Sequence, residues 1–414
     1  MDATMHIFLV ILRAALRGEK LVLDREVAPD EWHRLFRLAG IHKVLPLFYE
    51  VSYREPSLMR EEALLASAKH QIRKQVFLQT VRTADFLEVN DRLQAAGVQP
   101  LVVKGIICRN LYPHPDHRPS GDEDVLIPPE QFETCHRVLT EFGMQAGEFR
   151  EKLSSAYEVP YRKAGSPLYI ELHKHLFPPE SDAYGSLNRF FAGVRERAVA
   201  VEIQGKTVYT LGCTDHLFYL ICHAFKHFLH SGFGIRQVCD MMLFANEYGA
   251  GIDWTQIVEN CKAIRAEKFA AAMFRIGEKY LVFDQDRAAC SGVWQKIEVD
   301  EAPMLEDLLS GGLYGDANLS RKHSSNITLD VVAAQRQGKK AKNPVVASAF
   351  PSASALESRY PYLKKHPYLL PVAWSSRLWE YARETGHVRD SNASDALKIG
   401  NERVALMKAY GIID

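Results

Sequence analysis

The sequence lacks a long uninterrupted hydrophobic run. The longest apolar stretch near the N-terminus, Ile7 to Leu12, ends at Arg13 and is far shorter than the ~20 residues that a membrane-spanning helix needs. Neither a basic leader nor a small-residue cleavage site accompanies this stretch, so we expect no signal peptide. The sequence therefore predicts a cytoplasmic protein that does not use a membrane.

An excess of charge of either sign is also missing. Lys and Arg number 51 and Asp and Glu number 51, so the formal net charge is zero. A protein that coats nucleic acid is usually strongly basic, and the balance therefore weakens the case for a nucleic-acid partner. Hydrophobic residues make up 47% and charged residues 25%, which excludes disordered, collagen-like and coiled-coil chains.

Cysteine motifs are absent as well. The seven cysteines include no CxxC pair, and most stand among apolar neighbours. This pattern predicts reduced cysteines in the protein core, as in other cytosolic proteins.

Changes in periodicity divide the chain into four regions. Residues 1–98 have apolar positions at helical spacing, with the longest periodic stretch over 60–96 and Gly97 where a helix-capping glycine belongs. Residues 99–212 alternate short β-rich runs with helical segments. Residues 213–300 predict helices over 214–230, 234–247, 254–264 and 267–282. Residues 301–414 predict a loop-rich segment and two C-terminal helices, over 371–385 and 393–411.

The 99–212 region predicts a small mixed sheet with helices packed on it. Its strand candidates are residues 99–103, 122–127, 157–161 and 168–173, and a hairpin formed by 199–203 and 207–211 around Gln204-Gly205. A helix opened by Pro128-Pro129 is expected to end near Gly143. The fold class is therefore α+β, a small mixed sheet embedded in helical N-terminal and C-terminal regions.

Two aspartates in this region point to metal chemistry. Asp122 and Asp124 alternate along a predicted strand, so their side chains share one face. Adjacent carboxylates repel each other, and a hard divalent cation such as Mg²⁺ relieves the repulsion. Glu171, in another apolar strand, would add a third acid if the two strands are neighbours. Three converging acids are what two-metal phosphoryl or nucleotidyl transfer requires.

Basic residues and glycine stand just before these acids. Lys104-Gly105 follows a predicted strand and opens a helix, and Arg118 and Ser120 precede Asp122. Such a turn offers backbone N–H groups and positive charge to phosphate. Neither GxxxxGK[ST] nor GxGxxG occurs, so a P-loop or a dinucleotide-binding fold is not expected.

These segments together resemble a known family. The similarity is carried by Leu101-Val-Val-Lys-Gly-Ile-Ile107, Leu111-Tyr-Pro113, Arg118-Pro-Ser-Gly-Asp-Glu-Asp-Val-Leu-Ile127 and Ile170-Glu-Leu-His173, and it continues through residues 223–227, 235–240 and 362–371. The pattern resembles the uncharacterised nucleotidyltransferase family of the polymerase-beta-like superfamily. The serine of the superfamily's glycine-serine turn is missing after Gly105, and the spacing from Gly105 to Asp122 is longer than usual.

The resemblance implies a nucleotidyltransferase palm with Asp122, Asp124 and Glu171 as catalytic and metal-binding acids. We expect Lys104, Gly105, Arg118, Ser120, His173 and Lys226 to bind the nucleotide, ATP or another NTP, with Mg²⁺ or alternatively Mn²⁺. The predicted reaction moves NMP, by default AMP from ATP, onto a hydroxyl or phosphate of a small molecule or peptide. The alternatives are kinase-like phosphoryl transfer on the same palm and a non-catalytic nucleotide-binding module.

Two further clusters have less specific meanings. His216, His223, His227 and His230 share a face of one predicted helix. We favour packing and hydrogen bonding against the palm over a metal site because the HExxH glutamate is absent, and contact of Lys226 and His227 with substrate or phosphate is the other alternative. Arg236 and Asp240 have the spacing of an ion pair on or between helices. The basic residues Arg336, Lys339, Lys340 and Lys342 predict a solvated loop, with an RNA or phosphate contact as the alternative.

Overall fold

The computed structural model describes residues 2–55, 62–147, 153–230, 232–290, 292–311, 328–329, 331–332, 335, 353–356, 360–385 and 393–414. The chain divides into two compact units. The first contains residues 1–224 and 234–312, and the second contains residues 225–233 and 313–414. Each unit is described separately below.

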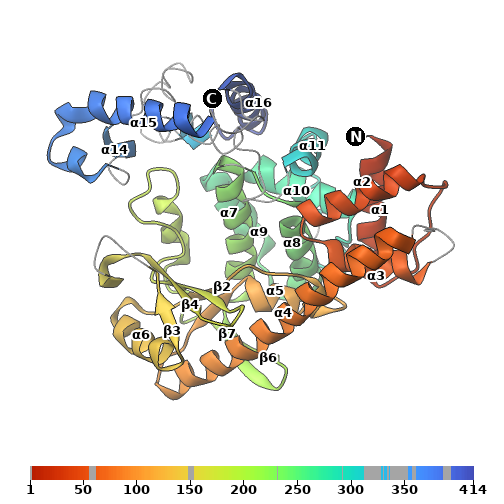
Figure 1. Cartoon of the computed structure of the whole chain (residues 1–414), viewed down its shortest axis with the longest axis horizontal. Coiled ribbons are helices and arrows are strands. Elements are labelled where there is room, and N and C mark those ends of the chain that lie inside the picture. Colours follow the sequence, from red (N-terminus) through yellow and green to blue (C-terminus); the bar gives the residue numbers. More distant parts are fainter. Residues whose placement is uncertain are drawn as a thin grey trace. The chain divides into compact units, whose positions relative to one another are not determined.

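The first unit begins with four helices, as the helical periodicity of residues 1–98 predicts. They are α1 (Ala3–Arg17), α2 (Pro29–Ile41), α3 (Leu45–Arg54) and α4 (Glu62–Ala95). The Asp2 carboxylate accepts a hydrogen bond from the Met5 backbone N–H at 2.7 Å and caps α1. The apolar run inside α1 lies in the core, with Phe8, Ile11 and Leu12 fully buried. The long helix α4 extends from these N-terminal helices to the sheet (Figure 1).

A single mixed sheet forms the centre of the first unit. Its strands are β1 (Leu101–Val103), β2 (Glu123–Leu126), β3 (Met144–Ala146), β4 (Glu158–Lys163), β5 (Tyr169–His173), β6 (Val199–Ile203) and β7 (Lys206–Thr210). The spatial order is β3-β4-β5-β2-β1-β7-β6. The β2–β5 and β1–β7 pairs are parallel and the other pairs are antiparallel. The α+β class predicted from the sequence is confirmed.

Two details of the sheet differ from the sequence expectation. The hairpin around Gln204-Gly205, both with positive φ (51° and 74°), forms as predicted, but its strand β7 also pairs with β1 and so extends the central sheet. Strand β3 was missed because it is only three residues long and directly follows the Gly143 turn. Both additions depend on pairing between segments distant in sequence, which local periodicity does not report.

Helices flank the strands and continue beyond them. Between the strands lie α5 (Gly105–Arg109) and α6 (Phe132–Glu141), and after them come α7 (Cys213–His230), α8 (Ile235–Tyr248), α9 (Trp254–Ala263), α10 (Glu267–Tyr280) and α11 (Ala302–Gly311). The four helices predicted between residues 214 and 282 are therefore present, with ends displaced by at most two residues. Six of the seven cysteines lie buried, and Cys213 is partly exposed.

The described part of the second unit is helical. It contains α14 (Ala353–Leu356), α15 (Leu370–Thr385) and α16 (Ala393–Ala409), which correspond to the two predicted C-terminal helices and one additional turn. Leu356, Leu363 and Ala373 form a small buried cluster, and the Thr328 hydroxyl donates to the Leu229 carbonyl at 2.6 Å. The basic residues Arg336, Lys339, Lys340 and Lys342 lie outside the described residues.

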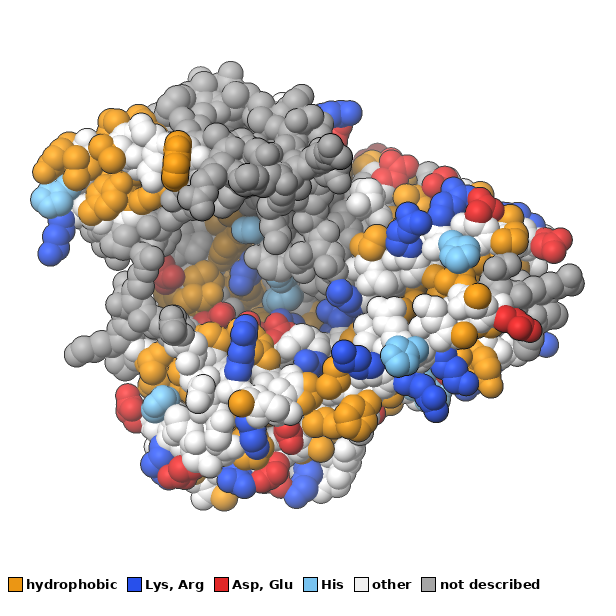
Figure 2. All heavy atoms as spheres, viewed as in Figure 1, with side chains coloured by type: hydrophobic (Ala, Val, Ile, Leu, Met, Phe, Trp, Pro, Cys, Tyr) orange, Lys and Arg blue, Asp and Glu red, His pale blue; other side chains and the backbone are white. Residues whose placement is uncertain are grey.

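Charge is mixed on the visible surface. On the face shown in Figure 2, basic and acidic side chains are interspersed among the described residues, in keeping with the zero net charge. No helix among the described residues is long and apolar enough to cross a membrane.

Candidate active site

The site is built around a sharp turn between β1 and α5. Lys104 connects the strand to the helix with φ 46° and ψ −115°, a conformation that side-chain-bearing residues rarely adopt. Two hydrogen bonds hold the turn: the Lys104 backbone N–H donates to His216 Nε2 at 3.1 Å, and the Ile106 N–H donates to Glu123 Oε2 at 2.8 Å. Two of the backbone N–H groups that the sequence suggested for phosphate binding therefore stabilise the turn itself.

Gly105 is required by the close approach of Glu123. A Cβ atom built on Gly105, which has φ +29°, would lie 2.2 Å from Glu123 Oε2. Glu123 is fully buried, and Arg109 Nη1 donates to its Oε1 at 2.6 Å. The Ser120 hydroxyl accepts from Arg109 Nη1 at 2.9 Å. Glu123 and Arg109 thus form a buried ion pair beneath the turn, which the sequence reasoning missed. The sequence did contain a signal for this pair, because side chains alternate along a strand and Glu123 must therefore lie on the face opposite Asp124. In the structure both faces of β2 are buried.

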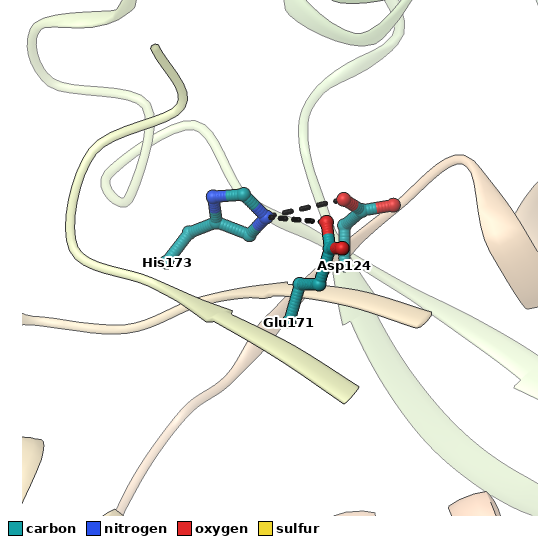
Figure 3. A group of neighbouring side chains, drawn as sticks. All are labelled: Asp124, Glu171 and His173. Carbon is teal, nitrogen blue, oxygen red and sulfur yellow. Dashed lines mark hydrogen bonds and ion pairs between the residues drawn. The ribbon is translucent and has the colours of Figure 1, made fainter. Parts of the chain in front are cut away.

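The acids converge through the parallel β2–β5 pair. Its register places Asp124 opposite Glu171 and Leu126 opposite His173. Because strand side chains alternate, Asp124, Glu171 and His173 share one face of the sheet. His173 Nε2 lies 3.1 Å from Asp124 Oδ1 and 3.8 Å from Glu171 Oε2 (Figure 3). One potential ligand atom from each of these three side chains lies within 4.8 Å of the other two.

Lys104 reaches this cluster from the turn. Its Nζ lies 2.7 Å from Asp124 Oδ2 and 3.1 Å from His223 Nε2, on α7. Burial opposes charge on both members of the pair, but Asp124 and Asp122 raise the pKa of Lys104, whereas Lys104 and His173 hold the pKa of Asp124 below its ordinary range. Both groups are therefore charged at neutral pH.

Negative charge nevertheless exceeds positive charge in the cluster. Burial, together with the carboxylates of Asp124, Glu158 and Asp122, raises the pKa of Glu171 to about 8. Glu158 comes from β4, and its Oε2 lies 3.6 Å from His173 Nδ1. A divalent cation bound by Asp124, Glu171 and His173 would relieve this repulsion. The donor set therefore fits a divalent metal, and its two carboxylates suit Mg²⁺ or Mn²⁺.

The group of described side chains close enough to share a metal does not include Asp122, the first of the two aspartates singled out in the sequence. This residue is partly exposed and directly precedes β2. Asp122 lines two separate pockets. One of them, here called the lysine pocket, also includes Lys104, Gly105, His223 and Arg236, and further out Arg118, Ser120, Leu220, Gln237 and Asp240. Most residues that the sequence assigned to phosphate binding thus line one pocket beside the acids.

Two arginines that line the lysine pocket, Arg118 and Arg236, have partners within the protein. Arg118 donates from Nε to Asp240 Oδ1 at 3.0 Å, and its Nη2 pairs with Asp240 Oδ2. The Tyr112 hydroxyl donates to the same Oδ1 at 2.7 Å. The expected Arg236–Asp240 ion pair is therefore wrong: Asp240 is buried and pairs with Arg118, and Arg236 donates to the Pro119 carbonyl. Local helix spacing could not indicate that a distant loop supplies the nearer cation.

The histidine helix supports the turn, as the packing interpretation predicts for His216. Its Nε2 accepts from the Lys104 N–H, which assigns the ring proton to Nδ1, next to the Thr210 hydroxyl at 3.1 Å. Complete burial lowers the pKa of His216 to about 3, so the ring is neutral. Lys226 belongs to the second unit, and its assignment to the nucleotide stays a prediction.

The comparisons with known proteins point in the same direction. No curated protein and no solved structure matches the chain. A family model described as an uncharacterised nucleotidyltransferase matches residues 28–281, which include the whole sheet, the acid cluster and the Lys104 turn. Since this match covers more than half of the chain, the protein belongs to the uncharacterised nucleotidyltransferase family.

Proposed function

We propose that the protein is a Mg²⁺-dependent nucleotidyltransferase that moves NMP, by default AMP from ATP, onto a hydroxyl or phosphate oxygen of a small molecule or peptide. The observation that carries the proposal is the position of Asp124 and Glu171, opposite each other on parallel strands, next to a lysine-bearing turn whose Nζ lies 2.7 Å from Asp124. Acids for a metal and a cation for phosphate thus stand side by side, as a metal-bound nucleotide requires.

Each residue has a distinct role in this proposal. Asp122, Asp124 and Glu171 hold the metal, and His173 either joins them as a ligand or orients Asp124 through its 3.1 Å contact. Bound Mg²⁺ supplies charge stabilisation at the α-phosphate and activates the attacking oxygen. Lys104, Gly105, His223 and Arg236 line the lysine pocket, which has a volume of about 50 Å³, and we assign this wall to the phosphates of the nucleotide. Arg118 and Ser120 position that wall through their contacts with Asp240 and Arg109.

Glu171 is the residue that we assign to take the proton of the acceptor hydroxyl. It lies opposite Asp124 across the parallel β2–β5 pair, so its carboxylate borders the expected metal and can accept a proton from a hydroxyl held there. The acceptor oxygen then attacks the α-phosphorus, the bond from that phosphorus to the bridging oxygen breaks, and pyrophosphate leaves.

The first test is nucleotide binding. We expect wild-type protein to bind α,β-methylene-ATP by calorimetry in MgCl₂ and to lose this binding in EDTA. The double variant D122N/D124N should lose at least about tenfold in Mg²⁺-dependent affinity, since two metal-binding carboxylates become neutral. Asp24→Asn removes one exposed acid elsewhere and should leave affinity unchanged. Unimpaired binding by the double variant would overturn the assignment of the two aspartates. Absence of binding by wild-type protein would contradict the proposal and both alternatives, since all three require a bound nucleotide.

The second test identifies the transferred group. Purified protein is incubated with a metabolite and peptide extract and with ATP labelled either at the α-phosphate or at the γ-phosphate. Nucleotidyl transfer incorporates only the α-label, whereas the kinase-like alternative incorporates only the γ-label. The double variant serves as the blank, and its circular dichroism spectrum should match that of wild type.

A further inference from the structure

A second pocket lies on the other side of Asp122. It has a volume of about 520 Å³, is open to solvent, and is lined by Arg82 of α4, Arg162 and Lys163 at the end of β4, and Tyr169 at the start of β5. Gly121, Ser166, Pro167 and Leu168 complete the lining. We call it the arginine pocket. Apart from Asp122, it shares no lining residue with the lysine pocket.

Strand register places this pocket directly beside the acids. Arg162 lies opposite Tyr169, and Pro160 lies opposite Glu171, in the antiparallel β4–β5 pair. Tyr169 precedes Glu171 by two residues, as Asp122 precedes Asp124, so Tyr169 and Glu171 share a face and stand about 7 Å apart along the strand. A molecule that packs against Tyr169 therefore has to extend only about 7 Å along the strand to reach Glu171.

The charge of the arginine pocket is opposite to that of the acid cluster. Arg82 donates from Nε to the Pro167 carbonyl at 3.0 Å, and it also donates to the Ser120 carbonyl, so its guanidinium is held in place. The Arg162 guanidinium lies 4.9 Å from the centre of the Tyr169 ring. Lys163 also lines the pocket, with its Nζ 3.7 Å from the centre of the Phe142 ring, and Asp122 is the one acid in the lining.

This arrangement suits an anionic group attached to a flat or apolar body. Guanidinium groups bind phosphate and carboxylate oxygens through paired hydrogen bonds, and Pro167, Leu168 and the partly exposed Tyr169 add apolar surface to the lining. The neighbouring row of acids repels an anion, so the anionic end of a ligand would lie on the arginine side and its uncharged hydroxyl would point to Glu171.

From this geometry we infer that the arginine pocket binds the acceptor substrate, and that the acceptor carries an anionic group, a phosphate or a carboxylate. The inference rests on the proposed function, because it assigns the lysine pocket to the triphosphate. Asp122, shared by both pockets, then stands between donor and acceptor. The acceptor hydroxyl attacks the α-phosphorus, its proton passes to Glu171, and pyrophosphate departs on the lysine side.

The test uses phenyl phosphate as an acceptor-like probe. Ligand-observed NMR titrations are made on the full chain in MgCl₂ and saturating α,β-methylene-ATP, which occupies the nucleotide site. We expect phenyl phosphate to bind under these conditions, and Arg162→Gln to weaken its binding about tenfold through loss of charge-assisted hydrogen bonds. Arg137→Gln is the matched control, because Arg137 is exposed on α6 and lies outside the pocket. The affinity of the Arg137→Gln variant for phenyl phosphate should equal that of wild type.

Three outcomes would overturn the inference: no binding of phenyl phosphate with or without the ATP analogue, equal binding by the Arg162→Gln variant, or binding only in a parallel titration without the analogue, which would make the arginine pocket part of the nucleotide site. Benzyl alcohol, which has the ring without the anion, should bind much more weakly, and equal binding would also contradict the inference. Calorimetry of the ATP analogue in the same samples distinguishes a failure of the acceptor assignment from a failure of the proposed function. If the analogue binds and phenyl phosphate does not, only the acceptor assignment fails.

Discussion

Lys104 Nζ lies 2.7 Å from Asp124 Oδ2, and both side chains are largely buried, with 15% and 3% of their surfaces exposed. This pair joins the two parts of the site, because Lys104 belongs to the turn after β1 and Asp124 to the strand beside Glu171. The same ammonium group neutralises an acid of the cluster and forms one wall of the lysine pocket.

Removing the Lys104 charge should destabilise the metal-free protein. Lys104→Gln leaves the Asp124 carboxylate buried without its cation, which costs about 3 kcal/mol, and Lys104→Arg should cost less because it keeps the charge. Urea unfolding followed by circular dichroism measures both. MgCl₂ should stabilise the Lys104→Gln variant more than wild type, because Mg²⁺ then binds Asp124 without competition from the Lys104 ammonium group. Equal stabilisation of the two proteins by MgCl₂ would contradict the proposed metal position.

Gly105→Ala should be strongly destabilising. The added Cβ would lie 2.2 Å from Glu123 Oε2, at a residue with φ +29°, so the buried Arg109–Glu123 pair must shift. We expect a loss of about 2 kcal/mol or more in the free energy of unfolding.

The matched control for this variant is Gly121→Ala, on the loop that precedes β2. A Cβ atom on Gly121 meets no atom within 4 Å, and its φ is not positive, so the change should stay within about 0.5 kcal/mol. Similar losses in both variants would show that close packing against Glu123 is not the reason for the glycine.

The Arg118–Asp240 pair should show strong energetic coupling. Asp240→Asn leaves the Arg118 guanidinium buried with a neutral partner, and we expect a loss of about 3 kcal/mol. Arg118→Gln should cost a similar amount, and the double variant should cost clearly less than the sum of the two. Urea unfolding of the four proteins gives the coupling energy. Additive losses would mean that the two side chains do not interact in solution.

Stability should fall in mild acid because of His216. Burial lowers its pKa from 6.5 to about 3, so below pH 6.5 the unfolded chain binds a proton that the folded protein does not bind. The folded state therefore loses stability as pH falls from 6.5 towards 3. Between pH 6.5 and 4.5, wild type should lose about 2 kcal/mol more than His216→Gln. The variant His33→Gln, at an exposed histidine, should follow wild type. Parallel curves for wild type and His216→Gln would contradict the burial of a neutral ring.

Local sequence patterns located most of the helices and strands of this protein and indicated its family. Helical periodicity located α4 and α7 through α10 to within about two residues. The alternation of Asp122 and Asp124 and the glycine after Lys104 indicated metal and phosphate chemistry, because these signals lie in residues close together in the chain. Membership of the nucleotidyltransferase family agrees with that expectation.

Which residues of the site lie in contact depends on the tertiary structure. The parallel pairing of β2 with β5 places Glu171 opposite Asp124, and the parallel pairing of β7 with β1 adds the hairpin to the same sheet. Asp240 pairs with Arg118 rather than with Arg236, four residues away on its own helix. The physical reason is the same in each case. Strand neighbours and buried ion pairs form between segments far apart in sequence, and their stability depends on burial and register, which no local pattern records.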